Sequence, residues 1–354
     1  MRYSKTDIVR KIRRLITYFE MQEEVPSQEE MGELWTKIKN GIDEKTQKRR
    51  RRHFWISVAS AAALIGIVWG GMNLYWNDAV QDISVIASKM NEGVVNTDEI
   101  QLIVSPDDVI SVKKGATIAY SQDGKLNVDK EKVDNAHSEK DFYDQIIVPK
   151  GKYTRLILAD GSSLHINAGT KVVYPKQFKR DRREIYVDGE VFIDVKRDES
   201  APFFVKTSQF EIEVLGTAFN VSAYETDVHA EVVLLRGSVK LKDSKKQTMM
   251  LSPNQLAAIN NGFITDKRNV NAQDYIAWTE GLLMLNGEPL ERVFEKLERY
   301  YGKTIRYDAD VRKLMVRGTL DLNCSFEEIM KRITVVVPII YENKANEIIV
   351  KKNR

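Results

Sequence analysis

One long apolar run, from about Phe54 to Trp76, interrupts the otherwise mixed pattern of hydrophobic and polar positions. Its roughly 23 residues carry no charge, and at about 1.5 Å per helical residue they can cross a hydrocarbon core of about 30 Å. Aromatic residues stand near both ends of the run, where they would lie at the two membrane surfaces. The pattern therefore predicts a transmembrane helix over residues 54–76.

Positive charge is concentrated directly before this run, at Lys48, Arg49, Arg50, Arg51 and Arg52. Acidic residues follow the run instead. Because the cytoplasmic flank of a transmembrane helix carries the Lys and Arg excess, the basic cluster indicates the orientation. We expect a single-pass protein of the inner (cytoplasmic) membrane, with its N-terminus in the cytoplasm and its C-terminus in the periplasm.

Three other interpretations of this region fit the sequence less well than a transmembrane helix. A cleavable signal peptide has a short basic start, but about 53 residues precede the apolar run here. A buried core helix is rarely an uncharged run of more than about 18 residues. A nucleic-acid patch would use the same basic cluster, yet its position against the apolar run makes it a topology signal first. The net charge of +3 does not require a nucleic-acid partner either, and we expect none.

Residues 1–53 are expected to form a short all-α segment with two apolar faces. Apolar residues recur at helical spacing on both sides of Val25-Pro26, and Ser27 and Glu30 have the spacing of a capping box. Fewer than about 60 residues build only a marginal core. The two faces therefore either pack together as a helical hairpin at the membrane or bind a partner, as in helix-in-groove recognition. The face residues in question are Ile12, Leu15, Ile16, Phe19, Leu34, Trp35 and Ile38.

After the apolar run, residues 77–145 read as a polar stalk and a strand-containing connector, with a hairpin signal at Asp123-Gly124. Residues 146–262 consist almost entirely of short β-rich runs separated by turn residues. Asp160-Gly161 and Asp188-Gly189 each predict a hairpin turn of type I′ between neighbouring runs. We expect an all-β domain here, and a sandwich, a barrel and a coil of strands all fit the pattern.

Residues 280–354 predict a compact α+β module in which the order strand-helix-strand occurs twice. Pro289 and Gly302 mark the start and the end of the first helix, and Ser325 with Glu328 caps the second. The predicted fold class is therefore multi-domain: a short all-α segment, one transmembrane helix, an all-β domain and a C-terminal α+β module.

Candidate catalytic chemistry is sparse. Four carboxylates that a hydrolase could use lie in turn dipeptides or alternate with apolar residues, so turns and solvated strand faces are the better interpretation. They are Asp160, Asp188, Glu190 and Asp194. His165 and His229 lie in strand-like runs without a nearby nucleophile or metal-binding cluster, and Cys324 is the only cysteine. We expect no enzymatic activity, no cofactor and no metal.

The β-rich region carries a series of motifs in a recognisable order. Val148-Pro149-Lys150-Gly151 is followed by LILADGSSLHINAGT, by Gly189-Glu190-Val191-Phe192 and by VLGTAFNVSAY, which ends at Tyr224. These motifs resemble those of the FecR-type transmembrane anti-sigma factors. The module that begins LLMLNGEPLERVFEKLERYYGKTI is similar to the one that follows in many members, so the resemblance covers nearly the whole chain.

The resemblance implies a signalling role. The cytoplasmic helices would bind an extracytoplasmic-function sigma factor, with the seven face residues named above as its contacts. The periplasmic region would receive a signal from the signalling domain of a TonB-dependent outer-membrane transporter, and intramembrane and periplasmic proteases would release the cytoplasmic piece. The alternative is a membrane-anchored periplasmic binding or scaffold protein with no transcriptional role, for which residues 1–53 would be an inert tail.

Overall fold

The computed structural model separates the chain into two compact units, Met1–Val80 and Gln81–Arg354. The residues that it describes are 5–20, 27–33, 35–37, 66, 82–91, 98–105, 108–122, 124–129, 131–132, 142–344 and 347–353. Apart from Gly66, the predicted transmembrane segment and its basic cluster lie outside these ranges. Within the ranges, no helix combines the length and the apolar character that crossing a bilayer requires. The transmembrane helix and its orientation stay predictions.

The first unit contains the amphipathic helix α1 (Lys5–Glu20) and helical residues at 28–33 and 35–37. The predicted capping box is confirmed at the start of the second stretch. The Ser27 backbone N–H donates to Glu30 Oε2 at 3.1 Å, and the Glu30 N–H donates to Ser27 Oγ at 3.4 Å. Two N–H groups that the helix cannot satisfy are thereby paired, which fixes where this helix begins.

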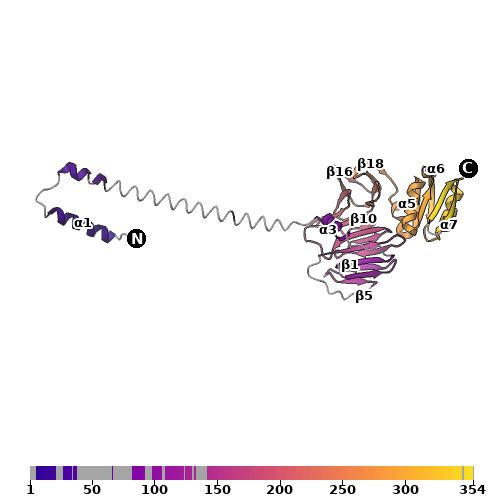
Figure 1. Cartoon of the computed structure of the whole chain (residues 1–354), viewed down its shortest axis with the longest axis horizontal. Helices are drawn as coiled ribbons and strands as arrows, with labels where there is room; N and C mark the ends of the chain where they lie inside the picture. Colours follow the sequence, from indigo (N-terminus) through magenta and orange to yellow (C-terminus); the bar gives the residue numbers. More distant parts are fainter. Residues whose placement is uncertain are drawn as a thin grey trace. The chain divides into compact units, whose positions relative to one another are not determined.

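The β domain (residues 98–269) is built from two sheets, shown in Figure 1, that share one long strand, β10 (Arg183–Asp194). Sheet A has the order β2 (Asp108–Val112), β1 (Ile100–Ser105), β6 (Tyr143–Val148), β9 (Thr170–Pro175), β10, β11 (Phe203–Lys206), β12 (Phe210–Val214), β15 (Val239–Asp243), β16 (Thr248–Leu251). Sheet B has the order β5 (Glu131–Lys132), β4 (Leu126–Val128), β3 (Thr117–Tyr120), β7 (Thr154–Ile157), β8 (Ser163–Ile166), β10, β13 (Ala218–Ala223), β14 (His229–Arg236), β17 (Gln255–Asn260), β18 (Phe263–Asn269).

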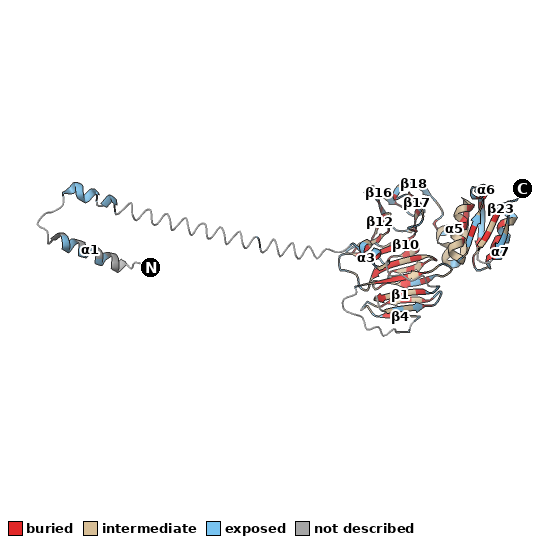
Figure 2. Ribbon diagram, in the orientation of Figure 1, coloured by how far each residue is buried: buried red, intermediate tan, exposed pale blue. Residues whose placement is uncertain are grey.

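A single apolar core joins the two sheets. Leu102 and Phe203 from sheet A and Leu156 and Phe219 from sheet B are all fully buried in it. Burial alternates along most strands, as Figure 2 shows, because successive side chains point to opposite faces of a sheet. The domain is therefore a two-sheet sandwich, one of the three architectures that the sequence pattern allowed, and strands from residues 98–132 belong to it as well.

The two Asp-Gly dipeptides of this domain have different structures. Asp160-Gly161 lies in a tight turn between β7 and β8, but only Gly161 has a positive φ, of 88°, so the turn is not of type I′. The hairpin predicted at Asp188-Gly189 is wrong, since β10 continues through it and passes from sheet A to sheet B. A Cβ at Gly189 would lie 2.3 Å from Thr170 Oγ1, so the glycine permits a close crossing rather than a reversal.

The C-terminal module (residues 282–353) confirms the two predicted strand-helix-strand units and adds one short helix between them that was not predicted. The module comprises β19 (Leu282–Pro289), α5 (Leu290–Tyr301), β20 (Thr304–Tyr307), α6 (Ala309–Arg312), β21 (Met315–Asp321), α7 (Phe326–Val336), β22 (Ile339–Lys344) and β23 (Glu347–Lys352). Helix α5 ends at Gly302 with φ 67°, and Ser325 and Glu328 form the expected capping box of α7. Helix α4 (Ala272–Ile276) and the 3-10 turn η1 (Ala277–Glu280) connect the module to the β domain.

Candidate functional surfaces

The predicted partner-binding residues of the first unit lie on exposed helices where the structure describes them. Ile12 and Ile16 of α1 are 49% and 52% exposed, and Trp35 is 65% exposed. Leu15 and Phe19 belong to α1, but their side chains, like Leu34 and Ile38, lie outside the described part. Apolar side chains exposed at helical spacing form a surface that another protein can cover, as helix-in-groove recognition requires.

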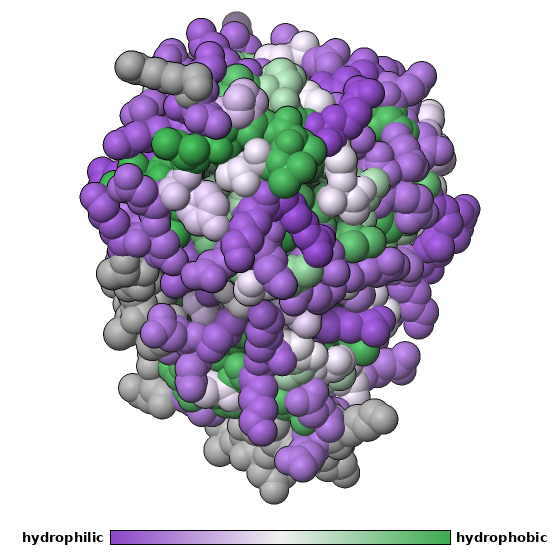
Figure 3. All heavy atoms as spheres, turned by 90° about the vertical axis from the view of Figure 1, so that its right-hand side faces the viewer, coloured by the Kyte–Doolittle hydropathy of each residue, from purple (hydrophilic) through white to green (hydrophobic). Residues whose placement is uncertain are grey.

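The C-terminal module carries a second exposed apolar surface. Val335 and Val336 at the end of α7 are 85% and 65% exposed, and Met315 of β21 and Ile340 of β22 are also exposed. Figure 3 shows apolar side chains gathered among polar ones on the face at this end of the molecule. The sequence pattern predicted the helices and strands of this module but gave no sign that these side chains would stay uncovered.

The module contacts sheet B through polar groups, along a boundary that we call the seam. The Arg299 guanidinium of α5 lies 3.9 Å from the centroid of the Tyr224 ring and forms an ion pair with Asp227. Arg292 Nη1 lies 3.1 Å from Glu231 Oε1 of β14. The apolar core of the module contains no residue of the β domain among those described, and the reverse also holds. The seam is therefore held by charges, a ring contact and hydrogen bonds rather than by a shared core.

Glu190 of β10 lies at the centre of a hydrogen-bonded chain under the seam. Asn167 Nδ2 donates to Glu190 Oε2 at 2.8 Å, and Asn220 Nδ2 donates to Glu190 Oε1 at 3.0 Å. Trp278 Nε1 of η1 in turn donates to Asn220 Oδ1 at 3.2 Å. Burial raises the pKa of Glu190 above its ordinary value, and these amides together with Lys296 and Arg299 only partly oppose the shift.

This position corrects the interpretation of Glu190 as part of a solvated strand face. The residue points outward from sheet B, as its alternation with apolar residues indicated, but the module covers it. A cavity of about 590 Å³ lies along the seam, lined by Glu190, Tyr224, Trp278, Lys296 and other residues. No sequence pattern marks Glu190 as partly buried, because its cover comes from a module about 100 residues further along the chain.

The other three carboxylates that a hydrolase could use have structural roles. Asp160 accepts hydrogen bonds from the Ser162 backbone and from Arg183 Nη1, at 2.9 and 2.7 Å. Asp188 accepts from the Glu225 backbone at 2.8 Å, and Asp194 pairs with Arg236. Among the described residues no group of three His, Cys, Asp or Glu side chains is placed to bind a metal. These side chains hold turns and strand ends.

Comparison with known proteins identifies the family. Residues 144–240 match the FecR protein family, and residues 282–350 match the FecR C-terminal family. A crystal structure at 1.65 Å resolution of a candidate anti-sigma factor from Parabacteroides distasonis ATCC 8503 is 35% identical, with a TM-score of 0.56, over 59% of this chain and 99% of that one. The chain belongs to the FecR family. This FecR-type protein is accordingly an anti-sigma factor, as its sequence motifs indicated.

A second crystal structure of a candidate anti-sigma factor from the same organism, at 2.50 Å resolution, is also similar to this FecR-type protein. The two chains are 35% identical with a TM-score of 0.56, over 60% of this chain and 100% of that one. The comparison with curated protein sequences gave no match. The two family matches include both sides of the seam, since Glu190 and Asn220 lie in the first and α5 in the second.

Proposed function

We propose that this anti-sigma factor spans the inner membrane once, holds an extracytoplasmic-function sigma factor in the cytoplasm and receives its signal in the periplasm. The observation that carries the proposal is the exposed apolar surface of the N-terminal helices, on a unit separate from the FecR and FecR C-terminal regions. The charge difference across residues 54–76 supports the orientation. The chain itself needs no catalytic chemistry in this role.

The sigma contact is tested by co-purification of the full chain, in detergent micelles, with each sigma factor of the cell. Trp35 is the best anchor, because exposed tryptophans often dominate binding energy at interfaces. We expect Trp35→Ala to weaken the complex by about 2 kcal/mol, or roughly 30-fold in Kd. Glu33→Ala in the same helix is the matched control and should bind as the wild type does. If the wild-type chain retains no sigma factor in mild salt, the result would favour the alternative of a membrane-anchored scaffold protein.

The proposed periplasmic receiver is the C-terminal module, and its partner is the signalling domain of a TonB-dependent outer-membrane transporter. The exposed apolar side chains around Val335 and Val336 support this assignment, because exposed apolar patches commonly mark interaction sites. The edge strand β22 offers unpaired backbone groups for strand addition.

The receiver is tested with Val335→Asp, a substitution at a side chain that is 85% exposed and should leave the fold intact. We expect a large loss of inducer-dependent transcription from a sigma-dependent reporter, because a charge in an apolar interface is costly to desolvate. Deletion of residues 280–354 should abolish the response completely. An unchanged response after the deletion would place the receiver elsewhere in the chain.

Release of the sigma factor is proposed to follow from cutting of the chain by periplasmic and intramembrane proteases. The apolar run at residues 54–76 and the segment after it are the parts of the chain that such enzymes would reach. Tracking the fragments of a doubly tagged chain in cells, before and after induction, tests this step. A chain that stays whole while transcription rises would rule it out.

A further inference from the structure

Helix α3 (Ile83–Asn91) lies on the outer face of sheet A, closely after the predicted membrane span in the sequence. Ile83 and Ala87 are each 1% exposed and pack against Val173 of β9 and Tyr186 of β10. On the opposite side of the helix, Val85 is 46% exposed. One face of α3 is thus buried by the β domain, and its other face is open to solvent.

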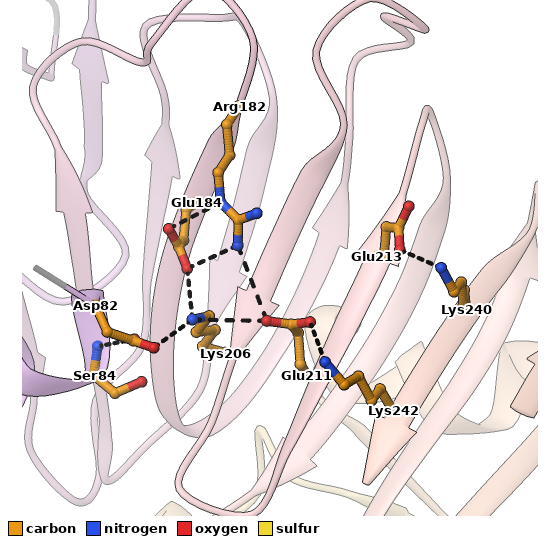
Figure 4. Close-up of polar contacts among 9 residues, drawn as sticks. All are labelled: Asp82, Ser84, Arg182, Glu184, Lys206, Glu211, Glu213, Lys240 and Lys242. Carbon is orange, nitrogen blue, oxygen red and sulfur yellow. Dashed lines mark hydrogen bonds and ion pairs between the residues drawn. The ribbon is translucent and has the colours of Figure 1, made fainter. Parts of the chain in front are cut away.

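An ion pair holds the first turn of α3. Asp82 Oδ2 lies 2.7 Å from Lys206 Nζ of β11, and Asp82 Oδ1 accepts a hydrogen bond of 3.0 Å from the Ser84 N–H. Lys206 Nζ also lies 3.1 Å from Glu184 and 3.7 Å from Glu211. Figure 4 shows these contacts on the sheet beside that with Asp82. If Asp82 departs, Lys206 keeps two carboxylate partners on the sheet. The Asp82–Lys206 ion pair therefore forms only while α3 is docked. Its loss does not leave the Lys206 charge without a partner.

The helical form of α3 depends on this docking. A helix of nine residues is too short to be stable alone in water, so an undocked α3 would not stay helical. Only a few apolar side chains hold it, whereas the sandwich beneath has a large core of its own. Opening of α3 is therefore a local event that leaves the β domain folded.

We propose that α3 is a guarded proteolysis site whose docking on sheet A decides whether a periplasmic endoprotease can cut it. The inference rests on the proposed function and adds the element that controls the cut. Endoproteases act on locally unfolded chain, so a docked helix resists them and a released one does not. In the cut, water adds its hydroxyl to the carbonyl carbon and a proton to the departing amine, so no further reactant is needed.

The test compares one substitution on the two sides of α3. Ala87→Glu places a carboxylate on the buried side, and Val85→Glu places the same group on the solvent side as the matched control. Purified full-length chains in micelles are treated with a protease of broad specificity, and the first cut is mapped by mass spectrometry. We expect Ala87→Glu to speed cutting within residues 82–91 by about tenfold or more, with Val85→Glu close to wild type.

A second variant, Ile83→Ala, removes apolar contact without adding charge and should also speed the cut. Hydrogen exchange in β9 and β10 shows whether the sandwich keeps its fold in each variant. Equal rates and equal sites of cutting for wild type and both buried-side variants would overturn the inference.

In cells, Ala87→Glu should activate the sigma-dependent reporter without inducer, while Val85→Glu should still need it. If Ala87→Glu opens α3 in vitro but the reporter still requires inducer, α3 does not control the signalling cut and the inference is wrong. That result leaves the proposed function standing. Failure of the wild-type chain to retain any sigma factor would instead overturn the proposed function, independently of how α3 is cut.

Discussion

The two outer faces of the β domain are each partly covered, but by elements of different kinds. Sheet A carries α3, a single short helix that has no core of its own. Sheet B carries the C-terminal module, which has a complete apolar core around Leu290, Phe294 and Ile329. Release of α3 therefore removes its helical structure, whereas release of the module leaves a folded domain. Helix α3 can therefore leave its sheet by unfolding, whereas the C-terminal module can leave its sheet as a folded body.

The electrostatics of the two faces also differ. On sheet A, burial opposes ionisation of Asp82, but hydrogen bonds from Lys206 and Ser84 outweigh it and hold the pKa below its ordinary value. Under the seam, burial is the larger influence and raises the pKa of Glu190 despite the two amides beside it. Like charge from Asp227 adds to burial in raising the pKa of Glu295 in α5. The α3 contact thus favours the ionised form of its carboxylate, whereas the surroundings of Glu190 and Glu295 disfavour the ionised form of theirs.

The largest expected effect is a loss of stability in the core of the C-terminal module that leaves the core of the β domain unchanged. Phe294→Ala should destabilise the module by about 3–5 kcal/mol, because it leaves a cavity at a fully buried position. The β domain should keep its stability, since its described core includes no module residue. Hydrogen exchange followed by mass spectrometry should show faster exchange in α5, α7 and β23 and little change in β10. Equal losses in both regions would mean that they unfold as one unit.

A smaller effect is expected from loosening the seam without unfolding the module. Arg299→Ala removes the ion pair with Asp227 and the stacking on Tyr224, which should weaken docking by about 1–3 kcal/mol. The Gly151 N–H, which donates to the Arg299 carbonyl at 2.8 Å, should then exchange faster. Arg306→Ala removes an ion pair inside the module, with Glu347, and is the matched control. Faster exchange in the control as well would remove the distinction between seam and module.

The smallest effect is a pH response of opposite sign on the two faces. Asp82 has a lowered pKa, so its contribution to α3 docking is present at neutral pH and is lost as the pH falls below about 4. Glu190 has a raised pKa, so protonation favours the docked seam. Docking should therefore tighten as the pH falls from 7 toward the ordinary Glu range.

The pH response can be followed by hydrogen exchange, corrected for its intrinsic pH dependence, in peptides from α3 and from η1. Glu190→Gln keeps the shape of the side chain but cannot ionise, so it should reduce the response at the seam and leave that of α3 unchanged. A shift in the same direction on both faces would contradict the assigned pKa directions.

Local signals predicted the local structure well. The capping box at Ser325 and Glu328, the helix end at Gly302 and the α+β order of the module all follow from neighbouring residues. Asp160-Gly161 and Asp188-Gly189 show that a local signal alone does not always predict the structure that forms. The same dipeptide makes a turn in one place and a strand crossing in the other, because Thr170 of β9 lies against Gly189.

The surfaces were harder to predict than the elements. Strand alternation correctly put Glu190 on an outward face, but it contains no information on which distant segment covers that face. The docking of α3 on Val173 and Tyr186 is non-local in the same way. The exposed positions Ile12, Ile16 and Trp35 were more accessible to prediction, since amphipathic spacing on a short segment indicates a face without an internal partner.

Strand β10 also determines the order in which the β domain can assemble as the chain is made. In both sheets, β1 to β9 lie on one side of it and β11 to β18 on the other. The first half can therefore form two part-sheets, each ending at a β10 edge that still lacks a neighbour. The later strands can then pair with those two edges in the order in which they occur in the chain. The β domain can in this way fold from its N-terminal end during synthesis, before the last residues of the chain have been made.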